Sequence, residues 1–295
     1  MDKREFDLLV RRQSQESASS FGYPIGDVVY DVYYTKEQFQ GYVEGLKAIR
    51  LDGNHPNAFL AYKDGKGGEL DETPGQGGGL VPPKMASVAS SSRFCVEAIL
   101  KAGRAEISKA FGLSEGYLLD AEHAVPFQRG GIAPQLDAYL ADGDHEVFVE
   151  SKCHEIFDAH SLAFRESYGR SFSMYDPDFI LPPVDAKGEF RLSSALLGIE
   201  EGVTLRFDAK QAISHLLGVR KQHRKKALLL FLFFKPCDCQ AYVELERQIE
   251  AFAKSPFVGR IVSGEFDVAF AYEASPKMAG LSESNYHVFC RIPKE

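Results

Sequence analysis

Two charged residues stand two positions apart at the end of an apolar stretch of the sequence. In HEVFVESKCH (residues 145–154), Glu150 and Lys152 close a run that has the pattern of a buried β-strand. Successive side chains of a strand alternate between its two faces, so both charges are expected on the face that carries Phe148. A carboxylate and an ammonium group directed at one point form either part of a reaction centre or an ordinary ion pair.

A second strand is expected directly before the first. Residues 134–141 (PQLDAYLA) are followed by an Asp-Gly pair at 142–143, which is typical of two-residue type I′ hairpin turns. A turn of this kind places Asp137 opposite Phe148 and diagonal to Glu150, with the two backbones roughly 7 Å apart. Because facing residues project to one side of a sheet, Asp137 is expected to share a face with Glu150 and Lys152.

Two acids and a lysine at one end of a hairpin have a specific chemical use. Two buried carboxylates repel each other, and their burial costs several kcal/mol unless a cation is present. A Mg²⁺ ion, with Mn²⁺ as an alternative, accepts one or two carboxylates and keeps several waters for a phosphate substrate. A nearby lysine can position the attacking water and offset charge in the transition state. The three residues therefore predict hydrolysis of phosphodiester bonds.

The elements around this hairpin indicate an α/β fold. A helix is expected from Ser92 to a C-cap at Gly112, and a later helix starts at a capping box formed by Asp208 and Gln211. The all-apolar run 227–234 predicts a central strand that is covered on both faces. The expected order is helix, three-strand antiparallel meander, helix and strand. The three strands of the meander are expected at 117–125, 134–141 and 145–153.

Additions to this core are expected at three places. Residues 1–89 predict an N-terminal extension that packs on the core, with a helix capped by Thr35 and a long, mobile Gly- and Pro-rich loop from Tyr62 to Ser92. Residues 90–295 form the core region. An irregular insertion is expected within it at about 154–206, where prolines interrupt any long element, and the residues after 236 form a C-terminal addition.

Over residues 90–236 this arrangement resembles the PD-(D/E)XK superfamily, the restriction-endonuclease-like nucleases. The matching parts are the helix, the hairpin that carries Asp137, the Glu150-Ser-Lys152 triplet, and the later helix and strand. The resemblance implies that Asp137 and Glu150 bind the metal ion and that Lys152 is the lysine of the E-x-K element. It implies a nuclease that depends on Mg²⁺ and cuts DNA.

The resemblance also implies a further acidic ligand. Members of the superfamily often add a glutamate from the first helix, and Glu97 is the candidate here, with Glu122 on the first strand as the second. The sequence departs from the family pattern at Leu136, which stands where proline usually precedes the aspartate.

Contacts with nucleic acid require a local cationic surface, because the net charge of the chain is −8. The run RKQHRKK has five cations in seven residues and could contact phosphates, although a solvated helix C-terminus explains it equally well. Gln211 and His215, one helical turn apart, either face the site or serve packing and capping. The five cations of the run are Arg220, Lys221, Arg224, Lys225 and Lys226.

Two other functions are compatible with the same sequence. A catalytically silent nucleic-acid-binding or scaffold protein of the same fold, or an RNA-directed nuclease, fits the same residues. The GLSEG stretch (112–116) follows a helix and precedes a strand, the reverse of a nucleophile elbow.

Five irregularly spaced cysteines, a charged N-terminus and no membrane-length apolar run predict a cytoplasmic protein with reduced thiols. Two-fold assembly is compatible with cutting both strands of DNA.

Overall fold

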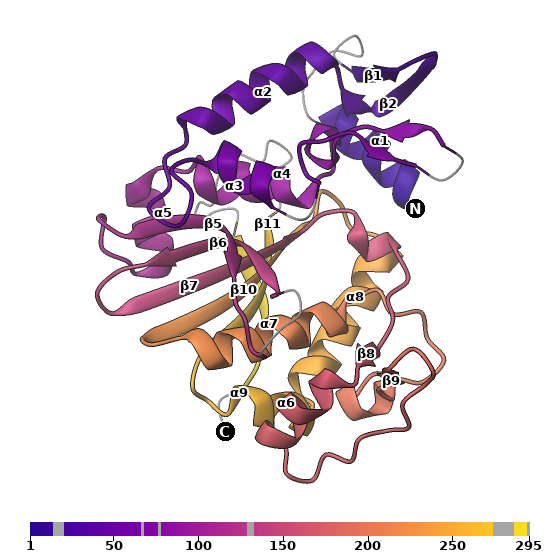
Figure 1. The fold of residues 1–295 in the computed structure, drawn as a ribbon, viewed down its shortest axis with the longest axis vertical. Coiled ribbons are helices and arrows are strands. Elements are labelled where there is room, and N and C mark those ends of the chain that lie inside the picture. Colours follow the sequence, from indigo (N-terminus) through magenta and orange to yellow (C-terminus); the bar gives the residue numbers. More distant parts are fainter. Residues whose placement is uncertain (14–20, 66–67, 76–77, 129–132, 274–285, 294–295) are drawn as a thin grey trace.

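A six-stranded mixed sheet forms the centre of the computed structural model, which describes residues 1–13, 21–65, 68–75, 78–128, 133–273 and 286–293. The strand order is β12-β11-β10-β7-β6-β5 (Figure 1). Strands β5, β6 and β7 form an antiparallel meander, β10 runs parallel to both β7 and β11, and β12 pairs antiparallel with β11. The bounds are β5 (Leu118–Ala124), β6 (Gln135–Ala141), β7 (His145–Lys152), β10 (Lys226–Phe234), β11 (Asp267–Glu273) and β12 (Tyr286–Arg291).

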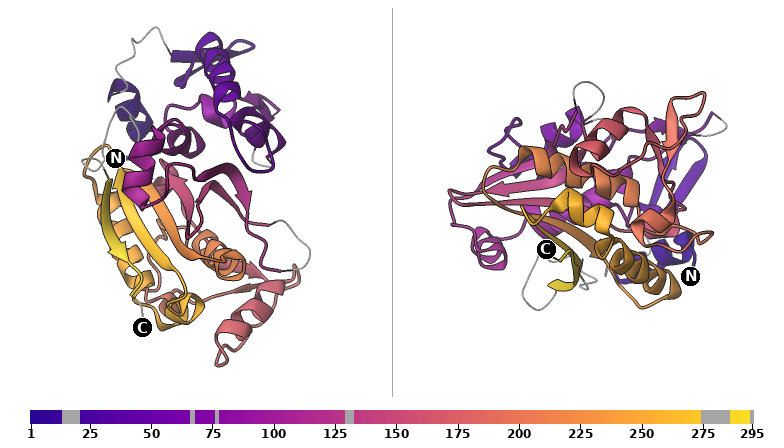
Figure 2. Two further views of the ribbon diagram at one scale, coloured as in Figure 1. Left: turned by 90° about the vertical axis from the view of Figure 1, so that its left-hand side faces the viewer. Right: turned by 90° about the horizontal axis from the view of Figure 1, so that it is seen from below.

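Helices lie on both sides of this sheet, as the ribbon views show (Figures 1 and 2). On one side are α7 (Ala209–Gln222), α8 (Gln240–Ala253) and α9 (Pro256–Val262). On the other side are α4 (Ser91–Cys95) and α5 (Arg104–Phe111). The predicted α/β architecture is confirmed at this level. Along the chain, α4 and α5 precede the meander, and α7 and β10 follow it after further short elements.

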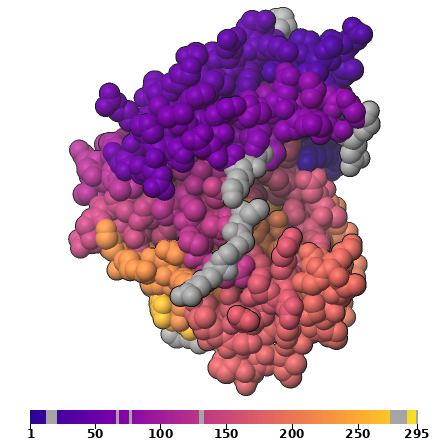
Figure 3. All heavy atoms as spheres, in the orientation of Figure 1, coloured from indigo at the N-terminus to yellow at the C-terminus, as the bar shows by residue number. Residues whose placement is uncertain are grey.

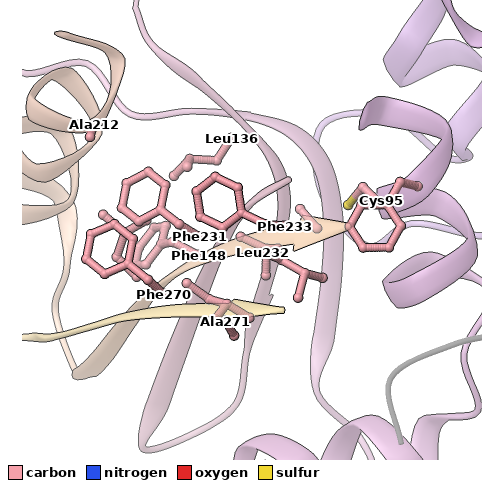
Figure 4. Close-up of a cluster of buried hydrophobic side chains, with 14 of the residues drawn as sticks. Cys95, Leu136, Phe148, Ala212, Phe231, Leu232, Phe233, Phe270 and Ala271 are labelled. Atoms are coloured by element: carbon pink, nitrogen blue, oxygen red, sulfur yellow. The ribbon is translucent and has the colours of Figure 1, made fainter. Parts of the chain in front are cut away.

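The apolar run expected to be central forms β10, with β7 on one side and β11 on the other. From Leu229 to Phe234 every residue is buried. Phe231 stacks on Phe270 of β11 with ring centroids 5.0 Å apart, and Figure 4 shows both rings in a cluster with Phe148 on the side where Ala212 of α7 lies. Full burial of each such ring contributes about 1.5–3 kcal/mol, so β10 anchors the strand that carries Glu150 and Lys152.

The β6–β7 hairpin forms, but with a different turn from the one predicted. Neither Asp142 nor Gly143 has a positive φ, which a type I′ turn requires at both positions. Instead, Asp142 Oδ1 accepts hydrogen bonds from the backbone nitrogens of Asp144 and His145, both at 2.8 Å. Backbone capping by this carboxylate explains the longer turn.

The longer turn moves the register by two residues. Tyr139, rather than Asp137, lies opposite Phe148. Two positions further along, the same register places Asp137 opposite Glu150. The predicted turn would have placed Gln135 opposite Glu150 instead. Because side chains alternate with a period of two, a shift of two residues changes the partners without changing the face of each strand.

The single helix expected from Ser92 to Gly112 is interrupted. Helix α4 continues into a π-helical turn (Val96–Leu100), and α5 begins after Gly103. Gly112 adopts the left-handed conformation (φ 68°) and ends α5, as predicted. The interruption therefore replaces the single expected helix with two shorter ones.

The N-terminal region forms a layer over the α4 side of the sheet (Figures 1 and 3). Thr35 caps α2 through a complete capping box, as predicted. The described part of the expected mobile loop instead contains short elements and buried side chains, including Glu69 and Met85. The layer comprises α1 (Lys3–Gln13), β1 (Phe21–Ile25), β2 (Val28–Tyr34), α2 (Lys36–Ala48), α3 (Ala58–Asp64), β3 (Thr73–Pro74), β4 (Leu80–Val81) and a 3₁₀ turn at Lys84–Ala86.

The expected insertion lies between the parallel neighbours β7 and β10. It contains β8 (Ala163–Arg165), α6 (Ser167–Tyr175) and β9 (Glu189–Arg191), with 3₁₀ turns at Glu155–Phe157 and Ser194–Leu197. Phe164, Phe172 and Phe190 are buried and contact one another edge-on or stacked. Phe172 also contacts Phe257 of α9, with ring centroids 5.3 Å apart, so this aromatic cluster joins the insertion to the main core. None of the helices in the described part of the chain is long and apolar enough to cross a membrane.

Candidate active site

Glu150 and Lys152 form a buried ion pair at the end of β7. Lys152 Nζ donates to Glu150 Oε1 over 2.6 Å, and the two side chains are 16% and 5% exposed. Burial opposes the charge of Lys152, but the carboxylates of Glu150, Glu155 and Asp137 outweigh it and raise the pKa of the lysine. Burial also raises the pKa of Glu150, and Lys152 offsets this only in part. The lysine is therefore held as a cation among several acids.

Asp137 approaches this pair from the neighbouring strand β6. Its Oδ2 accepts a hydrogen bond from the backbone nitrogen of Ser151 over 2.7 Å and another from the Ser151 hydroxyl. The same hydroxyl also lies 2.9 Å from the carbonyl oxygen of Ser91 on α4. Burial and the charge of Glu150 raise the pKa of Asp137 to about 7, with Lys152 and the Ser151 bonds acting in the opposite direction. The structure brings Asp137 and Glu150 together, and Ser151, the middle residue of E-x-K, fixes the aspartate.

Glu122 extends this set to β5. The pairing of Ala121 with Ala138 and of His123 with Leu136 places Glu122 opposite Asp137. We call Glu122, Asp137 and Glu150, which lie on three neighbouring strands, the acid row. Burial, followed by the charge of Asp137, raises the pKa of Glu122 to about 9.

Glu122 also has an unusual backbone. Its φ of 52° lies in the left-handed region, which costs a non-glycine residue of order 1–3 kcal/mol. Its carboxylate lies against Gly65, the C-cap of α3, where an added Cβ would be 3.1 Å from Glu122 Oε2. The carboxylate of Glu122 therefore borders the N-terminal layer.

Glu69 is a further acid beside the row that sequence reasoning missed. It accepts hydrogen bonds from Ser92 Oγ (3.0 Å) and Lys84 Nζ (3.4 Å). Burial raises its pKa, and the charge of Asp137 adds to this effect. Glu69 lies in the Gly- and Pro-rich segment, whose composition gave no sign of a buried acid. Its proximity to Asp137 arises only from the tertiary fold.

Glu97, the first candidate for an additional ligand, lies in the π-helical turn and pairs with Lys101. The two side chains are 2.7 Å apart, one helical turn from each other. No hydrogen bond or ion pair in the described residues joins Glu97 to Asp137 or Glu150. The geometry favours Glu122, the second candidate, as the acid beside Asp137.

The basic run lies at the other end of β7 and β10 from Glu150, since Lys226 pairs with His145. Arg220 donates to the carbonyl oxygens of Ile261 and Val262 and pairs with Glu265. Lys221 donates to Phe127 O, Lys225 to Asp142 O, and Arg224 to two carbonyls at the end of α7. These contacts give the run a role in holding α7 and the β6–β7 turn, and its binding of phosphates stays a prediction.

His215 and Gln211 lie on α7, and the ring of His215 faces Glu150 of the acid row. His215 is 1% exposed, and its Nδ1 lies 3.7 Å from Glu150 Oε2. Burial and then the charge of Lys152 lower the pKa of His215 to about 3, so the ring is neutral at neutral pH. Gln211 lines a cavity with Lys152 and also a second one with His215.

The site is thus a buried group of acids around Lys152, carried by the mixed sheet. Among the described residues, no three His, Cys, Asp or Glu side chains already form a metal-binding group. No protein-family model, curated protein or solved structure matches the chain. Its function must be inferred from the site itself.

Replacing Glu122 with glutamine is expected to stabilise the metal-free protein at alkaline pH. The pKa of Glu122 is about 9 in the folded protein, against the usual glutamate value of 4.5 that applies to the unfolded chain. Between these values the folded protein keeps a proton that the unfolded chain loses, so stability falls as pH rises through this window. Glu122→Gln should gain at least ~1 kcal/mol at pH 8, or roughly 2–4 °C in Tm, and nothing at pH 4.

Thermal unfolding in a chelating buffer measures this effect. The exposed Glu106→Gln on α5 serves as the control and should leave the pH dependence unchanged. An equal change of Tm at pH 4 and pH 8 for Glu122→Gln would show that the carboxyl group is not responsible.

Proposed function

We propose that this protein is a Mg²⁺-dependent nuclease that hydrolyses DNA phosphodiester bonds, with a restriction-endonuclease-like core. The observation that carries the proposal is the placement of Asp137 and Glu150 on adjoining strands with Lys152 bonded to Glu150. An ion pair that served stability alone would need one acid. Here further carboxylates, Glu122 and Glu69, gather at the same place.

The donor set fits a divalent ion. Among the described residues, two lysines form ion pairs with these acids: Lys152 with Glu150, and Lys84 with Glu69. The acids, which also include Asp137 and Glu122, outnumber them. The buried hydroxyl of Tyr62 has no hydrogen-bond partner and lies close enough to Asp137 and Glu122 for their charges to affect it. Excess carboxylates beside an unpaired polar atom are the surroundings in which a hydrated cation is stabilised.

Each side chain then has a defined role. Asp137 and Glu150 would hold the ion, which when bound polarises the phosphate and lowers the pKa of a bound water. Ser151 keeps the Asp137 carboxylate in place through its backbone nitrogen. Lys152 has three donors and uses one for Glu150, so it can orient the attacking water and offset charge on the phosphate.

The test is incubation of the purified full chain with single- and double-stranded DNA and RNA in the presence of Mg²⁺ or Mn²⁺. Lys152→Ala is expected to reduce DNA cleavage by at least about 100-fold. Lys187→Ala is the matched control, since Asp185-Ala-Lys187 repeats the acid-x-Lys pattern on an exposed loop. Cleavage by Lys152→Ala at the wild-type rate would contradict the proposal.

Two other outcomes would identify the alternatives. Cutting of RNA alone would indicate an RNA-directed nuclease. Calorimetry without any Mg²⁺ or Mn²⁺ uptake that depends on Asp137 would indicate a silent nucleic-acid-binding or scaffold protein, in which Lys152 has only a structural role.

A further inference from the structure

One buried nitrogen at the site lacks a partner. The ring of His215 lies beside the backbone of Gln135, at the start of β6. Its ring nitrogen Nδ1 is buried and has no hydrogen-bond partner. In a neutral imidazole one nitrogen carries the proton and the other presents a lone pair. With the proton on Nε2, Nδ1 of His215 is an unused electron-pair donor directed at the interior of the protein.

This lone pair faces a carboxylate. His215 Nδ1 lies 3.7 Å from Glu150 Oε2, while Lys152 occupies the other oxygen, Oε1. Two electron-pair donors that face each other repel unless a proton or a cation lies between them. Two neighbouring ligands of one divalent ion with bonds of about 2.1 Å lie roughly 3–4 Å apart. The observed separation thus suits a single ion bound to both atoms.

A cavity beside His215 opens to solvent. Its volume is about 460 Å³, and it lies between α7 and the residues at the start of β6. Its lining includes Gln135, Tyr168, Lys210, Gln211 and Ser214. The polar lining can hold the waters that complete the coordination of an ion with only two protein ligands in this region.

We propose that His215 Nδ1 and Glu150 Oε2 bind a divalent transition-metal ion and that the site takes Mn²⁺ in preference to Mg²⁺. Mg²⁺ favours oxygen ligands alone, whereas imidazole nitrogen is a good ligand for first-row transition metals. The inference rests on the proposed metal-dependent function and names the ion and a ligand from α7. This ligand lies outside the β6–β7 hairpin that carries Asp137, Glu150 and Lys152.

Binding of Mn²⁺ to the metal-free full chain tests this proposal without any substrate. Pulsed electron paramagnetic resonance should detect a directly coordinated ¹⁴N nucleus in the wild type, and calorimetry should show tighter binding of Mn²⁺ than of Mg²⁺. His215→Asn places an amide oxygen near the position of Nδ1 and removes the imidazole nitrogen, and the amide nitrogen of asparagine is not a metal ligand. The variant should abolish the ¹⁴N coupling and lower the Mn²⁺-to-Mg²⁺ affinity ratio by at least about 10-fold.

His223→Asn is the matched control, because His223 follows the same helix and also has a buried, unpartnered Nδ1. It should change neither reading. Mn²⁺ binding to the wild type without ¹⁴N coupling, or an unchanged affinity ratio in His215→Asn, would overturn the proposal. If His215→Asn does not fold, the wild-type spectrum alone decides. Mg²⁺-dependent cleavage without ¹⁴N coupling would leave the nuclease proposal intact, whereas ¹⁴N coupling without cleavage would refute only the nuclease proposal.

Discussion

Replacing Asp137 with asparagine is expected to abolish Mg²⁺-dependent cleavage and, at the same time, to make the metal-free protein more stable. Asparagine retains an oxygen that can accept the hydrogen bond from the backbone of Ser151. It removes a negative charge opposite Glu150, and with it one of the proposed protein ligands. We expect a loss of cleavage of at least about 1,000-fold, since catalysis depends on charge placed at the phosphate.

The stability gain follows from the pKa of Asp137, which is about 7 in the folded protein against an ordinary 3.8. Between these values the folded state holds a proton that the unfolded chain has lost, so the wild type loses stability as pH rises from about 4 to 7. Asp137→Asn removes this loss. At pH 8 in a chelating buffer it should gain of order 1–3 kcal/mol, and at pH 4 nothing.

Urea unfolding at the two pH values, together with the cleavage assay, measures both effects. Asp120→Asn on β5 is the matched control. Asp120 is buried and lies 3.0 Å from His123 Nδ1, so its replacement should cost stability and leave most of the cleavage. Parallel losses of stability and cleavage in Asp137→Asn would instead indicate that Asp137 has a structural role.

Replacing Lys152 with methionine should destabilise the protein more than any other single change at the site. It leaves the Glu150 carboxylate buried without its 2.6 Å partner, and breaking a buried pair in this way costs about 3–5 kcal/mol. At about 2–4 °C per kcal/mol, the cost corresponds to a fall in Tm of roughly 6–20 °C. Methionine preserves most of the side-chain volume, so the lost charge dominates the change.

A double-mutant cycle separates the pair from its surroundings. Glu150→Gln combined with Lys152→Met should recover most of the stability, because neither charge is then buried alone. Glu150→Gln alone should cost less than Lys152→Met, since Lys152 keeps the nearby charge of Glu155. The measurement is urea unfolding of all four proteins at pH 7. Additive effects of the two changes would show that the pair is not coupled.

The strands of the site could be predicted from local patterns because their alternation and apolar runs are short-range signals. Residues 226–234 and 145–152 form strands within a residue or two of the expected limits. The hairpin register could not be predicted, because the Asp142 carboxylate caps the turn and lengthens it. The register differs from the prediction by two residues, which leaves Asp137 on the same face of the sheet. Asp137 therefore lies near Glu150 as predicted, although the predicted turn type was wrong.

The acids outside the hairpin were harder to place. Glu97 was expected on the first helix. The sequence did not reveal that this part of the helix is a π-helical turn, or that Glu97 pairs with Lys101. The left-handed φ of Glu122 has no local signature in the sequence, and β5, which carries Glu122, is in contact with the distant segment α3. Glu69 was hidden in a segment whose composition indicated a loop. In each case contacts between distant segments override the local pattern.

The insertion begins at the end of β7 and ends at α7, which leads into β10, the hydrogen-bonded neighbour of β7. Its ends are thus anchored, and the entropy of closing such a connection changes by only about 0.6 kcal/mol for each doubling of its length. The insertion supplies Tyr168 to one cavity beside the site and His160 and Arg206 to the other. A protein built this way can acquire new specificity by remodelling one segment, while the hairpin that bears its charged groups stays untouched.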